Sequence, residues 1–195
     1  MELKRIDLFP TPVWSITLKD INLLDIKKYV LQLQKNDKNG VQITNQGGWQ
    51  SPATNIFPSH KSFSQLSNSI SSAINICASF MDLELSFRLQ NYWFNINEYG
   101  DYNDLHNHRG AIFSGVFYID IPQKNSGNIR FQRDDDIDYY IPHNLIKRYN
   151  LNIGSSVSYA PMNGKLYIFP SWLKHAVESN RSQETRMSMS FNYGL

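Results

Sequence analysis

The chain has 195 residues, a length that suits one well-buried domain and is short for two. Its residues are 41% hydrophobic, 13% aromatic and 18% charged, which excludes a disordered chain and favours β structure, because Tyr and Phe are enriched in strands. The net charge of +2 comes from scattered basic residues and gives no support for a nucleic-acid partner.

The first predicted element is a strand within residues 7–18. Apolar and polar side chains alternate there after Pro10 and Pro12, and because proline lacks an N–H donor for the sheet, the segment suits a sheet edge. Asp20 can then cap a helix, since the apolar residues that follow keep helical spacing until the turn-forming run that ends at Gly40. We therefore expect an edge strand followed by a first helix.

A second helix is predicted from Ser62 to about Met81, where apolar residues recur at intervals of three and four. The irregular segment before it carries Trp49, which we expect to pack on the core. Cys77 is the single cysteine, so an internal disulfide framework is excluded, and its place on the apolar side of the helix predicts a buried, unreactive thiol. Both helices are expected to buttress a sheet.

From Leu83 onward the apolar period changes to two, and turn residues separate short strand-like segments. The predicted strands are Ser86–Glu98, Tyr102–His108, Ala111–Asp120, Gly127–Gln132, Ser155–Pro161, Lys165–Phe169, Ala176–Glu178 and Thr185–Tyr193. No helix is predicted between these strands, so the sheet that they form must pack its apolar face on a second sheet and keep its edges protected. This predicts an antiparallel double-sheet jelly roll. The fold class is thus mainly β with N-terminal helices: a double-stranded β-helix (cupin-like jelly roll) forming one domain over 1–195, in which 1–82 support the barrel core at 83–195.

A long insertion, residues 133–150, separates two of these strands and carries the acidic run 134–136. We interpret the run as part of a solvated loop. The alternative is that the loop overhangs a functional site, since loops often carry such roles.

Three histidines are the candidate metal ligands. His106 and His108 are one residue apart in a predicted strand, so their side chains point to the same face. His175 follows a predicted strand and a Pro turn, and it can meet them if the two segments pair. Imidazole suits iron, and the mouth of a jelly roll is a usual ligand site. His60 and His143 lie in loop-like contexts near prolines without partners and are left out, because an isolated histidine is more often a surface residue.

Arg186, Ser188 and Ser190 share one face of the last predicted strand. Alternation alone leaves open whether this face points into the barrel or to solvent, and the short distance in sequence from His175 favours the barrel interior. A guanidinium inside a barrel needs a paired anion, and its fork can hold a carboxylate through two hydrogen bonds.

These segments together resemble the 2-oxoglutarate/Fe(II)-dependent oxygenases. More narrowly, they are similar to a small bacterial and phage family of 2OG-Fe(II) oxygenases that is distantly similar to prolyl 4-hydroxylases. The resemblance spans nearly the whole chain and is carried by Leu8–Trp14, Gly47–Ser51, Trp93–Asn97, His106–His108, Ser114–Tyr118, Phe169–His175 and Arg186–Asn192.

The resemblance implies Fe(II) as the metal, 2-oxoglutarate as the co-substrate and O2 as the oxidant. It makes His106 the first iron ligand and His175 the distal one. The residues that it assigns to 2-oxoglutarate are Arg186 for the C5 carboxylate, helped by Ser188, together with Tyr118 and Asn97.

The chain departs from the family pattern at position 108, where His-x-His replaces His-x-Asp or His-x-Glu. A neutral ligand in place of a carboxylate leaves the metal centre one unit more positive. His108 can bind the metal, Asp104 can turn in instead, or two protein ligands can hold it.

The leading hypothesis is a 2-oxoglutarate-dependent dioxygenase that hydroxylates a protein side chain, a metabolite or a nucleobase and releases succinate and CO2. One alternative is a cupin-like protein in which three histidines bind a metal for another reaction or for none. A third is a metal-free ligand-binding jelly roll with Trp93, Trp172 and Tyr139 as stacking platforms.

Since no apolar run approaches the ~20 residues needed to cross a bilayer, we expect a cytoplasmic protein without membrane contact.

Overall fold

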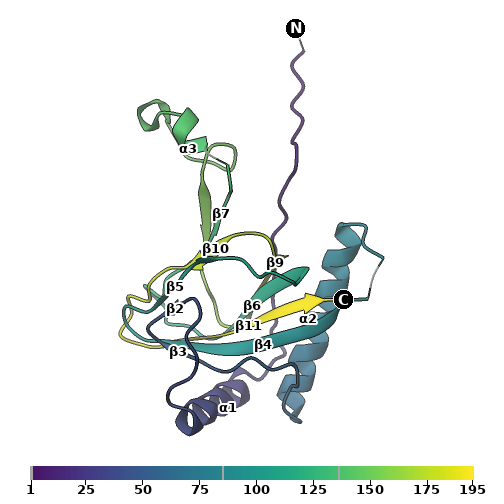
Figure 1. The fold of residues 1–195 in the computed structure, drawn as a ribbon, viewed down its shortest axis with the longest axis vertical. Coiled ribbons are helices and arrows are strands. Elements are labelled where there is room, and N and C mark those ends of the chain that lie inside the picture. Colours follow the sequence, from purple (N-terminus) through teal and green to yellow (C-terminus); the bar gives the residue numbers. More distant parts are fainter. Residues whose placement is uncertain (1, 85, 136) are drawn as a thin grey trace.

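The computed structural model describes residues 2–84, 86–135 and 137–195, and it contains two antiparallel sheets that face one another (Figure 1). The first sheet has six strands in the order β1-β9-β6-β11-β4-β3, and the second has five in the order β2-β5-β10-β7-β8. The strand bounds are β1 Trp14–Thr17, β2 Asn45–Gln46, β3 Trp49–Gln50, β4 Arg88–Asn97, β5 Tyr102–His106, β6 Phe113–Asp120, β7 Ile129–Gln132, β8 Ser156–Tyr159, β9 Lys165–Pro170, β10 His175–Val177 and β11 Arg186–Gly194.

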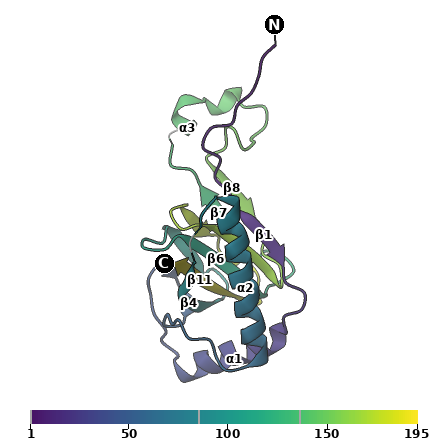
Figure 2. The same ribbon diagram turned by 90° about the vertical axis from the view of Figure 1, so that its right-hand side faces the viewer.

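Two long helices, α1 (Leu23–Asn36) and α2 (Lys61–Phe80), lie against the outer face of the six-stranded sheet (Figure 2). The prediction of a mainly β jelly roll with two N-terminal helices is therefore confirmed. All eight strands predicted from residue 83 onward are present as β4 to β11, with shifted boundaries. Within the described residues, none of the helices combines the length and the apolar character needed to cross a bilayer.

Side chains of β11 alternate between two regions: the apolar core under the helices and the space between the two sheets. Met187, Met189 and Phe191 point outward into the core that the sheet shares with the helices, while Arg186 and Ser188 point between the sheets. This core also receives Trp49, which is 5% exposed, as expected. Cys77 belongs to the same core, and burial raises the pKa of its thiol to about 12, which agrees with the expected unreactive group.

The first helix begins later than predicted. Asn22 caps α1, because its side-chain oxygen accepts a hydrogen bond from the Asp25 backbone N–H at 3.3 Å, so the assignment of Asp20 as the cap is wrong. The edge strand is also shorter than the 7–18 segment, since only the residues from Trp14 onward pair with β9.

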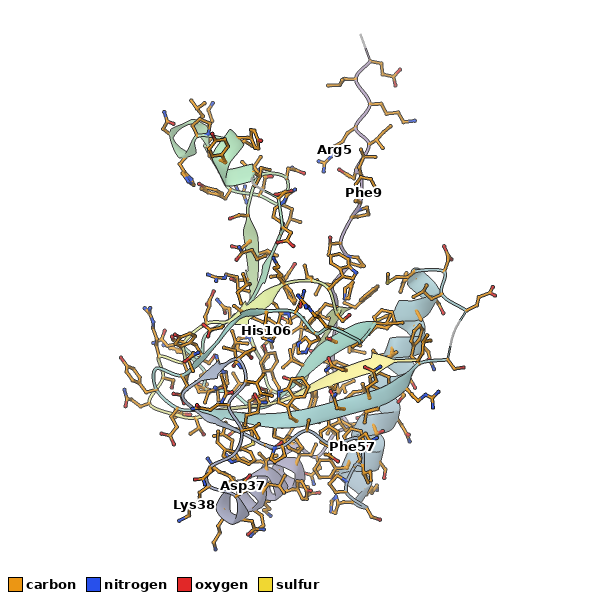
Figure 3. All side chains as sticks on the ribbon, in the orientation of Figure 1. Arg5, Phe9, Asp37, Lys38, Phe57 and His106 are labelled. Atoms are coloured by element: carbon orange, nitrogen blue, oxygen red, sulfur yellow. The ribbon has the colours of Figure 1, made fainter. Side chains whose placement is uncertain are left out.

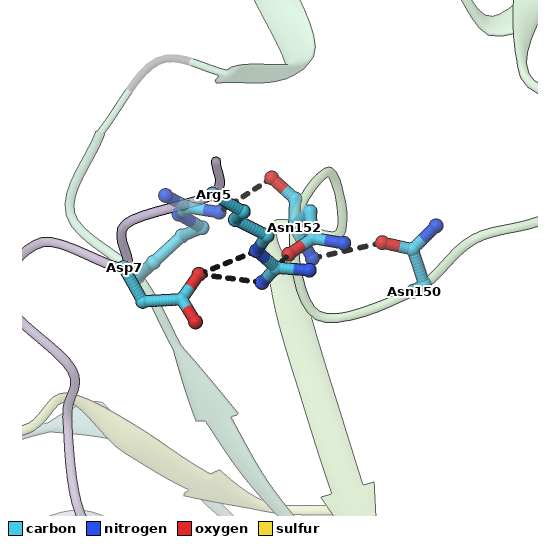
Figure 4. Close-up of polar contacts among 5 residues, drawn as sticks. Arg5, Asp7, Asn150 and Asn152 are labelled. Atoms are coloured by element: carbon cyan, nitrogen blue, oxygen red, sulfur yellow. Dashed lines mark hydrogen bonds and ion pairs between the residues drawn. The ribbon is translucent and has the colours of Figure 1, made fainter. Parts of the chain in front are cut away.

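The insertion between β7 and β8 projects away from the sheets (Figure 1) and contains two short helices, α3 (Ile137–Tyr140) and the 3-10 helix η1 (His143–Leu145). The N-terminal segment runs beside it (Figure 4). Arg5 donates one hydrogen bond to Asp7 of its own segment and another to Asn152, and the second bond links the segment to the insertion. Asp134 and Asp135 are exposed, as expected for a solvated run, and residue 136 of that run lies outside the described residues.

Candidate functional site

The structure brings the three predicted histidines together between the sheets. His106 ends β5 and His175 begins β10, and the two residues are direct partners in the antiparallel register. His108 lies two residues beyond the end of β5, so its prediction as a strand residue is wrong, and its backbone N–H donates to the Ser171 carbonyl at 3.0 Å. One ring nitrogen from each of the three histidines lies within 4.8 Å of the others. His106 is labelled in Figure 3, between the two sheets.

Backbone carbonyls orient two of the three rings. The Nδ1 atom of His106 is 2.6 Å from the Asp104 carbonyl, and Nδ1 of His175 is 3.0 Å from the Leu173 carbonyl. Because a carbonyl can only accept, each Nδ1 carries the proton and each Nε2 keeps a free lone pair. Metal-binding histidines in proteins are commonly fixed in this way, so both rings are held in the form that coordinates through Nε2.

Burial keeps the cluster neutral. Removal from water lowers the pKa of His175 to about 3 and that of His108 to about 4, and it also lowers the pKa of His106. The neighbouring imidazoles add to this effect, because a second positive charge nearby is unfavourable. Neutral imidazole is the form that binds metals.

The spacing of two of the three nitrogens fits one transition-metal ion. Consider two nitrogen ligands that each lie about 2.1 Å from the same ion. If the nitrogen–ion–nitrogen angle is between a right angle and the tetrahedral angle, the two nitrogens lie roughly 3.0–3.4 Å apart. The Nε2 atoms of His108 and His175 are 3.2 Å apart. Asp104 does not join them, since its carboxylate accepts a hydrogen bond from Gln46 at 2.6 Å and is absent from the described ligand cluster.

Arg186 lies in the same cavity as the histidines and is 1% exposed. Its Nη1 donates to the carbonyls of Ser126 at 2.6 Å and Glu178 at 2.9 Å. Its Nη2 is buried and has no hydrogen-bond partner within the part of the chain that the structure describes. A buried cationic donor without an acceptor is unfavourable, so this atom fits an anionic ligand inside the cavity.

The remaining predicted co-substrate residues line this cavity too: Tyr118, Ser188 and Asn97. Ser188 is paired with Asn95 on one side and Tyr118 on the other, so β4, β11 and β6 supply neighbouring polar groups. Burial raises the pKa of the Tyr118 hydroxyl, which stays protonated. None of the described residues that line the cavity carries a carboxylate.

The sequence reasoning missed several residues of this site. Thr44 and Asn103 line the cavity, and the carbonyls of Ser126 and Glu178 hold Arg186. Asn95 could have been found, because it shares a face of β4 with Asn97. The backbone carbonyls leave no signal in the sequence, because every residue carries one.

The three proposed stacking platforms are not gathered in one place. Trp93 lines the cavity, with its ring centroid 5.6 Å from that of His108, whereas Trp172 is 58% exposed and Tyr139 is 85% exposed on α3.

The two other histidines also differ from the prediction that they lack partners. His60 caps α2 by accepting from the Ser62 N–H, and His143 contacts the Tyr149 hydroxyl.

Comparison with known proteins places this geometry in a family. The family model described as "Putative 2OG-Fe(II) oxygenase" matches residues 91–192, which include all three histidines and Arg186. None of the curated proteins compared with this sequence matches it.

Solved structures with low sequence identity share the fold. A Pseudomonas putida prolyl-4-hydroxylase is 15% identical with a TM-score of 0.63, covering 95% of this chain and 94% of that one. The carbocyclase SnoK of nogalamycin biosynthesis is 12% identical with a TM-score of 0.67 and coverages of 94% and 79%. A viral collagen prolyl hydroxylase of Paramecium Bursaria Chlorella virus-1, in complex with 2OG, is 11% identical with a TM-score of 0.58 and coverages of 94% and 96%.

Proposed function

The chain belongs to the 2OG-Fe(II) oxygenase family, and we propose that it is a non-haem Fe(II), 2-oxoglutarate-dependent dioxygenase that hydroxylates its substrate and releases succinate and CO2. His106, His108 and His175 hold the metal in this proposal. Arg186 holds the C5 carboxylate of 2-oxoglutarate, with Ser188, Tyr118 and Asn97 around it. The primary substrate belongs to one of three classes: a protein side chain, a metabolite or a nucleobase.

One observation carries the proposal: a single cavity contains a cluster of neutral imidazole nitrogens and a buried guanidinium with a spare donor. A dicarboxylate with a keto group can use both, one end at the metal and the other at Arg186. The buried Nη2 supplies the hydrogen bond that fixes the far carboxylate, since charge-assisted bonds of this kind are strong and directional.

Fe(II), 2-oxoglutarate and O2, when bound, supply the oxidising chemistry that places a hydroxyl group on a C–H carbon. The protein residues position the reactants and exclude water. Phe131 and Phe169 pack beside the His175 ring, with centroids 6.2 and 4.6 Å away, so one side of the cluster is apolar. The protonated Tyr118 hydroxyl can donate a hydrogen bond to a bound oxyanion.

The cupin-like alternative is favoured by one feature, the lack of a carboxylate in the described ligand cluster. Three neutral histidines can hold a divalent metal for a reaction that does not consume 2-oxoglutarate. Turnover of the co-substrate therefore separates the two functions.

The test is an anaerobically loaded Fe(II) protein given 2-oxoglutarate and O2, with succinate measured as the product. We expect succinate from the wild type even without a primary substrate, at a slow uncoupled rate, and none from His175→Ala. His143→Ala is the matched control, because His143 lies on the insertion away from the cavity. In parallel, Ni(II) should raise the melting temperature of the wild type and of His143→Ala but not of His175→Ala, since a ligand of the folded state stabilises it.

Metal stabilisation without succinate formation would favour the cupin-like function. Neither effect in the wild type would favour the metal-free ligand-binding jelly roll.

A further inference from the structure

A second concavity lies on the opposite face of the five-stranded sheet. Ala176 and Arg130 are direct partners on β10 and β7, next to the partners His175 and Phe131. Because side chains alternate along a strand, Ala176 and Arg130 point away from the histidines. They line a groove of about 800 Å³ whose walls come from β5, the loop 122–128 and the segment after β10. This volume suits a small organic ligand.

Three cations line this groove without ion-pair partners among the described residues: Lys124, Arg130 and Arg181. The Nε of Arg130 is buried and has no hydrogen-bond acceptor within the same described part of the chain. The backbone segments that carry Lys124 and Arg181 lie side by side, because the Arg181 N–H donates to the carbonyl of Asn125 at 2.7 Å. The groove is therefore lined by three cationic side chains that form no ion pair with the described residues.

Both carboxylates that line the groove already have donors of their own. Glu178 accepts from the Ser158 hydroxyl at 2.9 Å and from the Asn128 N–H at 3.1 Å, and Asp104 accepts from Gln46 at 2.6 Å. These carboxylates are thus held by neutral groups of the sheet and do not pair with the three cations. What the groove lacks is an acceptor for the cationic donors, and an oxyanion supplies one.

Apolar side chains also line the groove, among them Ala176, which is 6% exposed, and Leu105, which is 41% exposed; we call these two the apolar floor. An aromatic or aliphatic group can cover these side chains while its acidic group meets the rim. We propose that the groove binds a small organic oxyanion, a phosphate monoester or a carboxylate with an apolar part, at a site separate from the histidine cavity.

The test measures binding of three probes to the full-length protein by isothermal titration calorimetry: phenyl phosphate, inorganic phosphate and benzoate. We expect phenyl phosphate or benzoate to bind more tightly than inorganic phosphate, because only these two cover the apolar floor. Their relative affinities identify phosphate or carboxylate as the preferred group. Amide NMR shifts should change most at residues that line the groove and not the histidine cavity, such as Lys124 and Arg181.

The variants test the cations directly. Arg130→Gln should weaken the best probe roughly two- to fivefold, the effect of losing one exposed or partly exposed charge pair. The Lys124→Gln, Arg181→Gln double variant changes only exposed side chains and should weaken it at least as much, which keeps the test valid if Arg130→Gln folds poorly. Arg88→Gln is the matched control, because Arg88 is exposed and lines neither cavity.

Equal affinity in all variants, or no binding of any probe by the wild type at millimolar concentration, would overturn the proposal. Loss of phenyl phosphate binding when metal and 2-oxoglutarate fill the histidine cavity would also overturn it, because the probe would then occupy that cavity.

Discussion

Arg186 combines deep burial with an incomplete set of hydrogen bonds. Two backbone carbonyls hold its Nη1, which fixes the guanidinium plane, while Nη2 remains available inside the cavity. A lysine at this position keeps the charge but loses the rigid fork.

We therefore predict that Arg186→Lys weakens 2-oxoglutarate binding by about tenfold, or about 1.4 kcal/mol, because the lysine keeps the charge but loses the fixed donor geometry of the guanidinium. Binding of 2-oxoglutarate to Ni(II)-loaded protein, measured by calorimetry, checks this. Stabilisation by Ni(II) alone should persist, and unchanged co-substrate affinity would contradict the role assigned to Arg186.

His108 sets the charge of the proposed metal centre. In the proposed complex, one negative charge of 2-oxoglutarate lies at the metal and the other pairs with Arg186. Since the described cavity residues include no carboxylate, the metal-bound end of the co-substrate is the only negative charge close to the metal ion. In His108→Asp the protein supplies one negative charge and repels the co-substrate.

We predict that 2-oxoglutarate tightens Ni(II) binding by at least tenfold more in the wild type than in His108→Asp, since like charges about 5 Å apart repel by about 3 kcal/mol at an effective dielectric constant of ~20, and a factor of ten needs about 1.4 kcal/mol. The measurement is Ni(II) affinity with and without 2-oxoglutarate in both proteins. The same factor in both would mean that His108 does not contribute to the charge of the centre.

At the scale of elements, the loop between β6 and β7 positions the arginine of β11. Gly127 in this loop has φ of 74°, and a Cβ at this position would lie 2.7 Å from Arg186 Nη1 and against the Glu178 carbonyl. Glycine is thus required both for the backbone conformation and for the close approach of the guanidinium.

Gly127→Ala should therefore lower both the free energy of unfolding and the affinity for 2-oxoglutarate. Gly110→Ala is the matched control: its φ is 89°, and nothing lies within 4 Å of the Cβ position. Gly110→Ala should lose about 1–2 kcal/mol of stability from backbone strain, measured by urea denaturation. Gly127→Ala should lose more, because its Cβ also collides with the Glu178 carbonyl, and only this variant should lose co-substrate affinity. Equal affinity in the two variants would refute the link between the loop and Arg186.

At the scale of the whole molecule, the helices of the first 82 residues and the strands of the remainder share one apolar core. Phe63 of α2 contacts Phe94 of β4 with ring centroids 6.3 Å apart, and Met189 belongs to the same buried cluster. Neither part can keep its apolar face out of water without the other.

We propose that residues 1–195 form one folding unit and predict a single cooperative unfolding transition. Tryptophan fluorescence and far-ultraviolet circular dichroism should give coincident urea curves, because small single domains usually unfold in two states. Two separated transitions would divide the 1–82 support from the barrel core.

The local sequence pattern by itself determined a large part of this protein's fold. The period of two from residue 83 onward predicted eight strands and the faces of β11, because side-chain alternation follows from strand geometry alone. The spacing of His106 and His108 likewise predicted that both rings point to the same side, and both belong to the histidine cluster, although His108 lies beyond the end of β5. The resemblance to the oxygenase family agrees with the family model that matches residues 91–192.

Only the tertiary structure decided which of these faces meet. Alternation left the direction of Arg186 open, and closure of the two sheets buried it beside the histidines. Asn22 rather than Asp20 caps α1, because the path of the chain into the helix selects between two residues with equal capping chemistry. The free Nη2 of Arg186 and the cationic groove behind His175 depend on contacts between distant segments, and contacts of this kind have no local sequence pattern.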